Sequence, residues 1–192
     1  MTTVSELVEV VAAAAEESLP TIRMMARRLI DDGVLPKAIG SRIPQATAEH
    51  AALLLFAVMA APLVKDATRT ALVYGGLTYN GYSAADTTTA LQGVSRLLRE
   101  IPQDVNALDW SLEVCINCLQ VVVRQPLAGP ENQTANGSRM IDSLYIEPGQ
   151  NWLRPPFKPL KRIASMSGEC LYTIGRALTA DTKRGDDGAY SY

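Results

Sequence analysis

The sequence has little of the residue types that most often transfer protons or bind metals. His50 is the single histidine among 192 residues, which excludes histidine-rich metal sites. Cys115, Cys118 and Cys170 are an odd number in a chain of this size, which favours reduced thiols over a disulfide framework. The first two form a C-x-x-C motif, but a structural zinc site needs about four ligands. We therefore expect no metal, no cofactor and no enzymatic activity.

Neither charge of one sign nor a long hydrophobic run dominates the chain. Its 18 basic and 20 acidic residues give a formal net charge of −2, so any basic surface must be local. The most apolar stretch, residues 51–64, contains Pro62 and is shorter than the roughly 20 residues of a bilayer-spanning helix. The N-terminus carries Glu6 and Glu9 and lacks the basic start of a secretory signal. We expect a cytoplasmic protein without membrane contact.

Hydrophobic periodicity predicts an α+β fold, with N-terminal helices followed by a small antiparallel sheet and a C-terminal helix. The apolar spacing predicts helices over residues 4–17, 22–32, 47–61, 83–101 and 169–178. Alternation predicts a strand from Trp110 to Cys118, with Val121–Val123 following, and a helix is the alternative there. Two more strands are predicted at residues 140–147 and 160–165, the second at a sheet edge because three prolines precede it.

Polar residues at the predicted helix starts and a glycine-rich connection divide the chain. Thr47 is predicted to cap the third helix, with His50 as a hydrogen-bonding residue at the edge of the core. Ser83 and Asp86 resemble a capping box for the fourth helix. The connection Tyr74–Tyr82 is a candidate boundary. We predict a helical region over residues 1–73, an α+β region over 83–180 and a flexible tail over 181–192.

The first three predicted helices have the proportions of a helix-turn-helix, in which the second helix lies in the major groove of DNA. Burial of its apolar stripe leaves an arginine-rich face outward, and guanidinium groups bind phosphates and guanine. The loop over residues 34–46, interpreted as a short wing, adds basic side chains. The predicted DNA contacts are Thr21, Arg23, Met24, Arg27, Arg28, Lys37 and Arg42. The alternative is a plain helical hairpin with a solvated arginine face.

The same N-terminal third resembles the opening of small regulator-like proteins of phages and prophages. The resemblance is carried by Ser5-Glu-Leu-Val8, Thr21-Ile-Arg-Met-Met-Ala-Arg-Arg-Leu-Ile30, Asp32-Gly-Val-Leu-Pro-Lys37 and Thr47-Ala-Glu-His-Ala-Ala-Leu-Leu-Leu55. It implies a phage-encoded regulator with an N-terminal helix-turn-helix. Residues 38–45 depart from the group's pattern, since they hold one glycine and one arginine where the group is richer in both.

Two hypotheses of function follow from these residues. The leading one is a phage-derived regulatory protein that binds double-stranded DNA through the helix-turn-helix. The competing one is a phage inhibitor that docks on a host enzyme or defence complex and occludes it. We also expect a homo-oligomer, because one helix-turn-helix gathers few phosphate contacts. The predicted oligomer surfaces are the strand Trp110–Cys118, the edge near residues 154–160 and the apolar face of the fourth helix.

Overall fold

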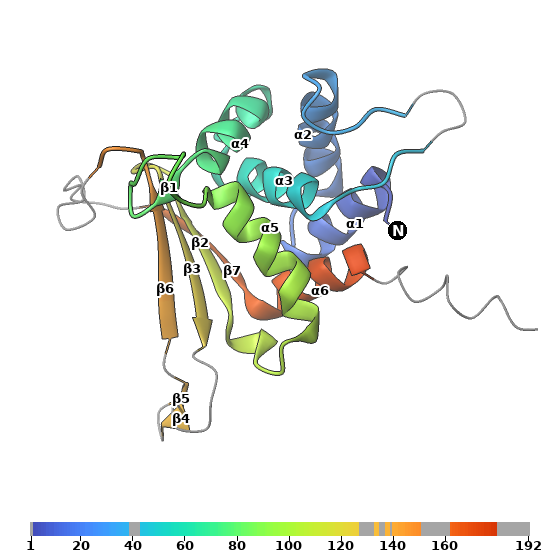
Figure 1. The fold of residues 1–192 in the computed structure, drawn as a ribbon. Helices are drawn as coiled ribbons and strands as arrows, with labels where there is room; N and C mark the ends of the chain where they lie inside the picture. The colour runs from blue at the N-terminus through green and yellow to red at the C-terminus, as the bar shows by residue number, and fades with distance from the viewer. Residues whose placement is uncertain are drawn as a thin grey trace, which may run out of the picture.

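The computed structural model describes residues 2–38, 43–126, 133–134, 137–138, 140–150 and 162–179. Within these ranges the chain forms six α-helices and a five-stranded antiparallel sheet, which confirms the predicted α+β class. Figure 1 shows the helices gathered on one side of the sheet. No helix of this part of the chain is long and apolar enough to cross a membrane. The predicted tail over residues 181–192 lies outside the described residues.

The helical layer surrounds one central helix. Its helices are α1 (Val4–Ala14), α2 (Leu19–Asp31), α3 (Ala48–Ala60), α4 (Ala67–Gly75), α5 (Ala90–Glu100) and α6 (Gly168–Thr179), with short 3₁₀ helices η1 (Val64–Asp66), η2 (Ile101–Gln103) and η3 (Ala107–Asp109) between them. α3 is buried on nearly every side and packs against α2, α4, α5 and the sheet. Its apolar sequence fits this place, because a helix without a polar face is stable only when it is enclosed.

The main sheet has the strand order β1-β6-β3-β2-β7. Its strands are β1 (Thr78–Tyr79), β2 (Ser111–Cys115), β3 (Gln120–Pro126), β6 (Met140–Ile146) and β7 (Ile163–Ser167), and β4 (Gln133–Thr134) and β5 (Gly137–Ser138) form a separate pair. Side chains at alternate positions, such as Leu112, Val114 and Val121, point into the core. The predicted edge strand is confirmed, because β7 pairs only with β2 among the described strands.

The predicted strand from Trp110 to Cys118 is wrong at its C-terminal end. β2 stops at Cys115, the next residues turn, and β3 begins at Gln120, so the segment is a hairpin. Leu119 closes the turn with a left-handed backbone, at φ 45°. Apolar and polar residues continue to alternate into the turn at residues 116–119. Periodicity alone therefore predicted a strand that runs on to Cys118.

Two features of the helices also differ from the prediction. α5 begins at Ala90, and Thr89, not Ser83, caps it with a hydrogen bond from the backbone N–H of Gln92. α4 was not predicted, because it has only nine residues and its apolar and polar side chains are not clearly separated into two faces. Pro62 shortly before it and Gly75 at its end also disfavoured a helix there. The predicted cap of α3 is confirmed: the Thr47 hydroxyl accepts a hydrogen bond from the N–H of His50.

Side chains of the predicted regions 1–73 and 83–180 contribute to the same core. α1 packs against α6, and the hydroxyl of Thr2 donates a hydrogen bond to the carbonyl of Ala177. α6 in turn packs closely on α5 at Gly175, where an added Cβ would lie 2.6 Å from the carbonyl oxygen of Leu98. The first and last helices are therefore held together by direct contact.

The contact at Gly175 makes a first prediction. Gly175→Ala should lower the free energy of unfolding by about 1–3 kcal/mol, because the backbone of α5 cannot move away without disturbing the core. Gly75→Ala is the control: its Cβ would meet Leu91 at an ordinary 3.5 Å, and alanine favours the helix by up to about 1 kcal/mol. Urea unfolding of both variants measures the difference. Equal stability of the two would contradict the assigned packing of α5 on α6.

Candidate nucleic-acid interface

The second helix has one buried and one exposed face. Ile22, Met25, Ala26 and Leu29 are buried against the core. Arg23 and Arg27 are four residues apart, as are Met24 and Arg28, so these side chains form one exposed stripe along the helix. We call these four residues the α2 face. Thr21, also predicted as a DNA contact, is half-buried in the first turn.

All members of the α2 face reach solvent. The exposed fractions of the arginine side chains are 59% for Arg23, 78% for Arg27 and 49% for Arg28, and Met24 is 58% exposed. The prediction that these residues point outward is therefore confirmed. The apolar Met24 lies among three guanidinium groups, so the α2 face combines positive charge with an adaptable apolar contact.

Each arginine of the α2 face has an acidic partner. A terminal nitrogen of Arg23 lies 3.0 Å from a carboxylate oxygen of Glu9 on α1. In the other two pairs the contact is made by Nε: Arg27 Nε is 3.4 Å from a carboxylate oxygen of Asp31, and Arg28 Nε is 3.1 Å from one of Asp32. Exposed pairs of this kind contribute at most about 1 kcal/mol each. A phosphate can therefore compete for these guanidinium groups.

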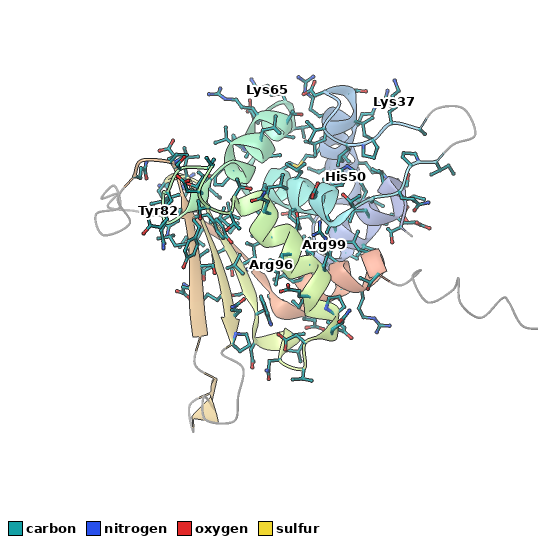
Figure 2. All side chains as sticks on the ribbon, viewed as in Figure 1. Lys37, His50, Lys65, Tyr82, Arg96 and Arg99 are labelled. Carbon is teal, nitrogen blue, oxygen red and sulfur yellow. A yellow bond between two sulfur atoms is a disulfide. The ribbon has the colours of Figure 1, made fainter. Side chains whose placement is uncertain are left out.

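Two lysines extend the positive charge beyond the helix. Lys37 follows α2 and Lys65 lies in η1, which packs beside α2. Figure 2 shows the two side chains at the end of the molecule where α2 lies, one on either side of it. Both are exposed, and neither makes an ion pair with a residue that the structure describes. Sequence reasoning missed Lys65, because η1 and α4 were not predicted.

The loop after α2 is attached at both ends. On one side Leu35 is buried, and its N–H donates to the carbonyl of Leu29, 3.1 Å away. On the other side Gln45 forms an antiparallel bridge with Thr3 just before α1. The two described ends of the loop are thus attached to the first two helices. Arg42, predicted as a DNA contact, lies outside the described residues.

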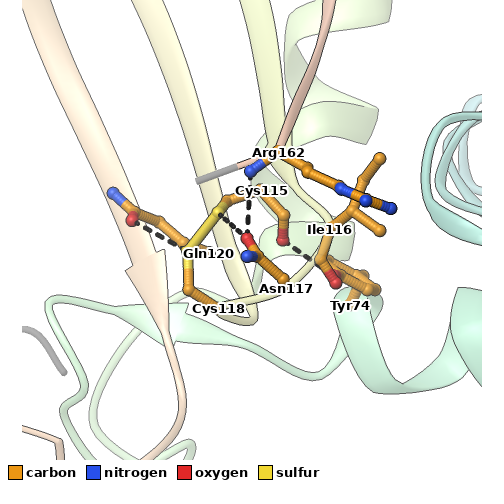
Figure 3. Close-up of a disulfide and its surroundings, with 7 residues drawn as sticks. All are labelled: Tyr74, Cys115, Ile116, Asn117, Cys118, Gln120 and Arg162. Atoms are coloured by element: carbon orange, nitrogen blue, oxygen red, sulfur yellow. Dashed lines mark hydrogen bonds between the residues drawn. A yellow bond between two sulfur atoms is a disulfide. The ribbon is translucent and has the colours of Figure 1, made fainter. Parts of the chain in front are cut away.

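The C-x-x-C motif is oxidised in the structure, so the expectation of reduced thiols at Cys115 and Cys118 is wrong. The two residues form a disulfide, with their Cα atoms 5.7 Å apart (Figure 3). Residues three apart on a straight strand point to opposite faces, but the hairpin turn between β2 and β3 removes that obstacle. Cys170 is a free thiol. No cluster of three or more metal-ligating side chains occurs in the described part of the chain.

The disulfide hairpin is held against the helical layer by Tyr74 of α4. The Tyr74 hydroxyl donates to the carbonyl oxygens of Cys115 and Ile116, at 2.8 and 3.0 Å (Figure 3). Burial raises the pKa of Tyr74 to about 12, so the phenol stays protonated and remains a donor at neutral pH.

The single histidine has a structural partner. Nδ1 of His50 accepts a hydrogen bond from the N–H of Thr47, at 3.1 Å, which completes the capping box of α3. Burial lowers the pKa of His50, although the nearby charge of Glu49 acts in the opposite direction. The lowered pKa favours the neutral imidazole, and this hydrogen bond requires that form. The predicted role of a hydrogen-bonding residue at the core edge is confirmed.

Comparisons of the chain with protein-family models, with curated proteins and with solved structures found no match. The functional assignment therefore depends on the chemistry of the exposed surfaces. One of these surfaces consists of the α2 face, Lys37 in the loop after α2 and Lys65 in η1. It carries positively charged side chains from three segments of the chain.

The disulfide gives a second prediction. In denatured, unreduced protein a maleimide should label one cysteine, Cys170, and after reduction it should label all three. Intact-mass spectrometry counts the labels. Reduction should lower the free energy of unfolding by no more than about 2 kcal/mol, because the disulfide closes a very short loop. Three labels without reductant would contradict the bond.

Proposed function

We propose that the protein is a phage-derived regulatory protein that binds double-stranded DNA through the α2 face. In this proposal α1 and α2 act as a helix-turn-helix, α2 enters the major groove, and the protein works in the cytoplasm of a host cell. The observation that carries the proposal is the exposed arginine stripe of α2, with a lysine at each side. Guanidinium groups are the donors that most often bind phosphates and guanine edges in a groove, and α2 presents three of them within two helical turns.

The ion pairs of the α2 face are compatible with this role. Arg27 and Arg28 contact their carboxylate partners through Nε, at 3.4 and 3.1 Å. The terminal nitrogens of a guanidinium are the donors that reach phosphate oxygens or the O6 and N7 atoms of guanine. DNA binding would thus need little rearrangement of Asp31 and Asp32, and these carboxylates would hold the arginines extended before DNA arrives.

A second candidate is docking on a host protein. It is favoured by the near balance of charge around α2, where Glu9, Asp31 and Asp32 oppose the three arginines, and by the exposed Met24. Protein interfaces are rich in arginine and methionine and tolerate mixed charge. The two candidates differ in salt dependence, because only DNA binding releases a condensed layer of counterions.

Replacement of Arg27 and Arg28 by alanine tests the proposal. The double variant should bind a mixed-sequence duplex at least about tenfold more weakly than the wild type in a gel-shift assay. The slope of log K against log[salt] should fall by about one for each phosphate that the variant no longer neutralises. The melting temperature should hardly change, because both side chains are exposed.

The matched control lies on α5. Arg96 and Arg99 are also exposed, at 62% and 58%, and also pair with carboxylates, but they lie away from α2 (Figure 2). Alanine at both positions should leave DNA binding unchanged. Equal weakening by the two double variants would indicate non-specific charge attraction. Unchanged binding after replacement of Arg27 and Arg28 would exclude the α2 face.

A further inference from the structure

The outer edge of β7 is unpaired in the part of the chain that the structure describes. β7 bonds to β2 on one side, and residues 163–167 make no other backbone hydrogen bond between strands. An unpaired strand edge offers a row of N–H and C=O groups to any extended chain, and proteins usually block or use it. β7 contains no proline or lysine that would block such pairing.

The hydrogen-bond pattern identifies which residues face this edge. The N–H of Ile116 donates to the carbonyl of Arg162, at 2.8 Å, while the N–H of Arg162 donates to the side chain of Asn117, so this position continues the β2–β7 ladder as one of the pairs whose backbone groups face each other. In an antiparallel ladder such pairs alternate, so Ala164 and Met166 also bond to β2. The backbone groups of Ile163, Ser165 and Ser167 consequently point away from β2, toward the free edge.

A groove of about 450 Å³ runs along that edge. It touches four consecutive residues of β7, 164–167, so it runs along the strand at its free edge, on the side of the sheet where the helices lie. Its other wall comes from the end of α1 and the turn after it, residues 14–17, and from Val58 and Met59 of α3. An added strand could therefore lie along β7, between this strand and the turn that joins α1 to α2.

The two ends of this edge carry opposite charges. Glu16 and Glu17 line the groove together with residues 164–167 and with Cys170 of α6, the helix that follows the C-terminal end of β7, and both are exposed. Arg162 lies just before the N-terminal end, is exposed, and makes no ion pair with a described residue. Figure 3 shows its side chain directed away from Asn117, which binds its backbone N–H. A strand with a base at one end and acids at the other is complementary to an antiparallel copy of itself.

We propose that a second copy of this chain occupies the groove, so that the two β7 strands pair antiparallel about Ser165. This register places Ile163 of each copy opposite Ser167 of the other, so that all edge-facing backbone groups meet. It also brings Ala164 opposite Met166 on the helical side. Arg162 of one copy then lies opposite Gly168 of the other, at the end of the groove that Glu16 and Glu17 line.

Two of the oligomer surfaces predicted from the sequence are instead buried within the chain itself. The apolar face of α5 is buried in the core of its own chain, with Val94 and Leu98 fully enclosed. The core-facing side chains Leu112 and Val114 of β2 are likewise buried. Residues 154–160 lie outside the described residues. The inference does not depend on DNA binding, since strand pairing leaves the α2 face free.

Light scattering after size exclusion tests the dimer. The wild type should have a mass of about 41 kDa, twice the 20.7 kDa of one chain. Ser165→Pro should give 20.7 kDa, because it removes an outward N–H that the monomer does not use and blocks the edge. Ser165→Ala is the control and should remain dimeric. A monomeric wild type at micromolar concentration, or a dimeric Ser165→Pro variant, would overturn the proposal.

Charge reversal tests the register without touching the strand. Arg162→Glu should weaken or abolish the dimer, and so should the pair Glu16→Lys with Glu17→Lys, since each variant opposes like charges. All three changes in one chain should restore the mass of about 41 kDa, twice 20.7 kDa. These side chains are exposed, so melting temperatures should stay close to the wild type. Failure of the triple variant to restore the dimer would exclude this register.

Discussion

The burial of α3 is the constraint on which the rest of the structure depends. Its apolar surface has no polar face to give to solvent, so other elements must enclose it, and α2, α4, α5 and the sheet do so. The capping box of Thr47 and His50 fixes where this helix begins. Because the apolar stripe of α2 packs into this core, its exposed arginine-rich face is left for other partners.

This arrangement explains why the two proposed interaction surfaces are separate. α2 uses its apolar stripe against the core and presents its arginines outward, whereas β7 has one side bonded to β2 and the other side open. A dimer built through β7 would make the two α2 faces parts of one assembly. Paired half-sites would raise the affinity for DNA without any additional interaction between protein and base.

The sequence was sufficient to predict the fold class and most helices, because amphipathic stripes and capping residues are local signals. It did not predict α4, whose nine residues follow Pro62 and carry a weak pattern, nor the hairpin turn at residues 116–119. The disulfide was missed for the same reason as the turn. The exposed arginines of α2 were predicted, but the contribution of Lys65 depends on tertiary packing of η1, which no local pattern encodes.

Site-specific photo-crosslinking tests the central claim, that the α2 face contacts DNA. Met24 is an exposed member of that face, whereas Leu108, 71% exposed, lies in η3. η3 belongs to the segment that joins α5 to β2, which Figure 1 shows at the end of the molecule opposite α2. A photoreactive phenylalanine analogue at position 24 should crosslink to a duplex on irradiation, and the same analogue at position 108 should not. Crosslinking from position 108 with none from position 24 would contradict the account.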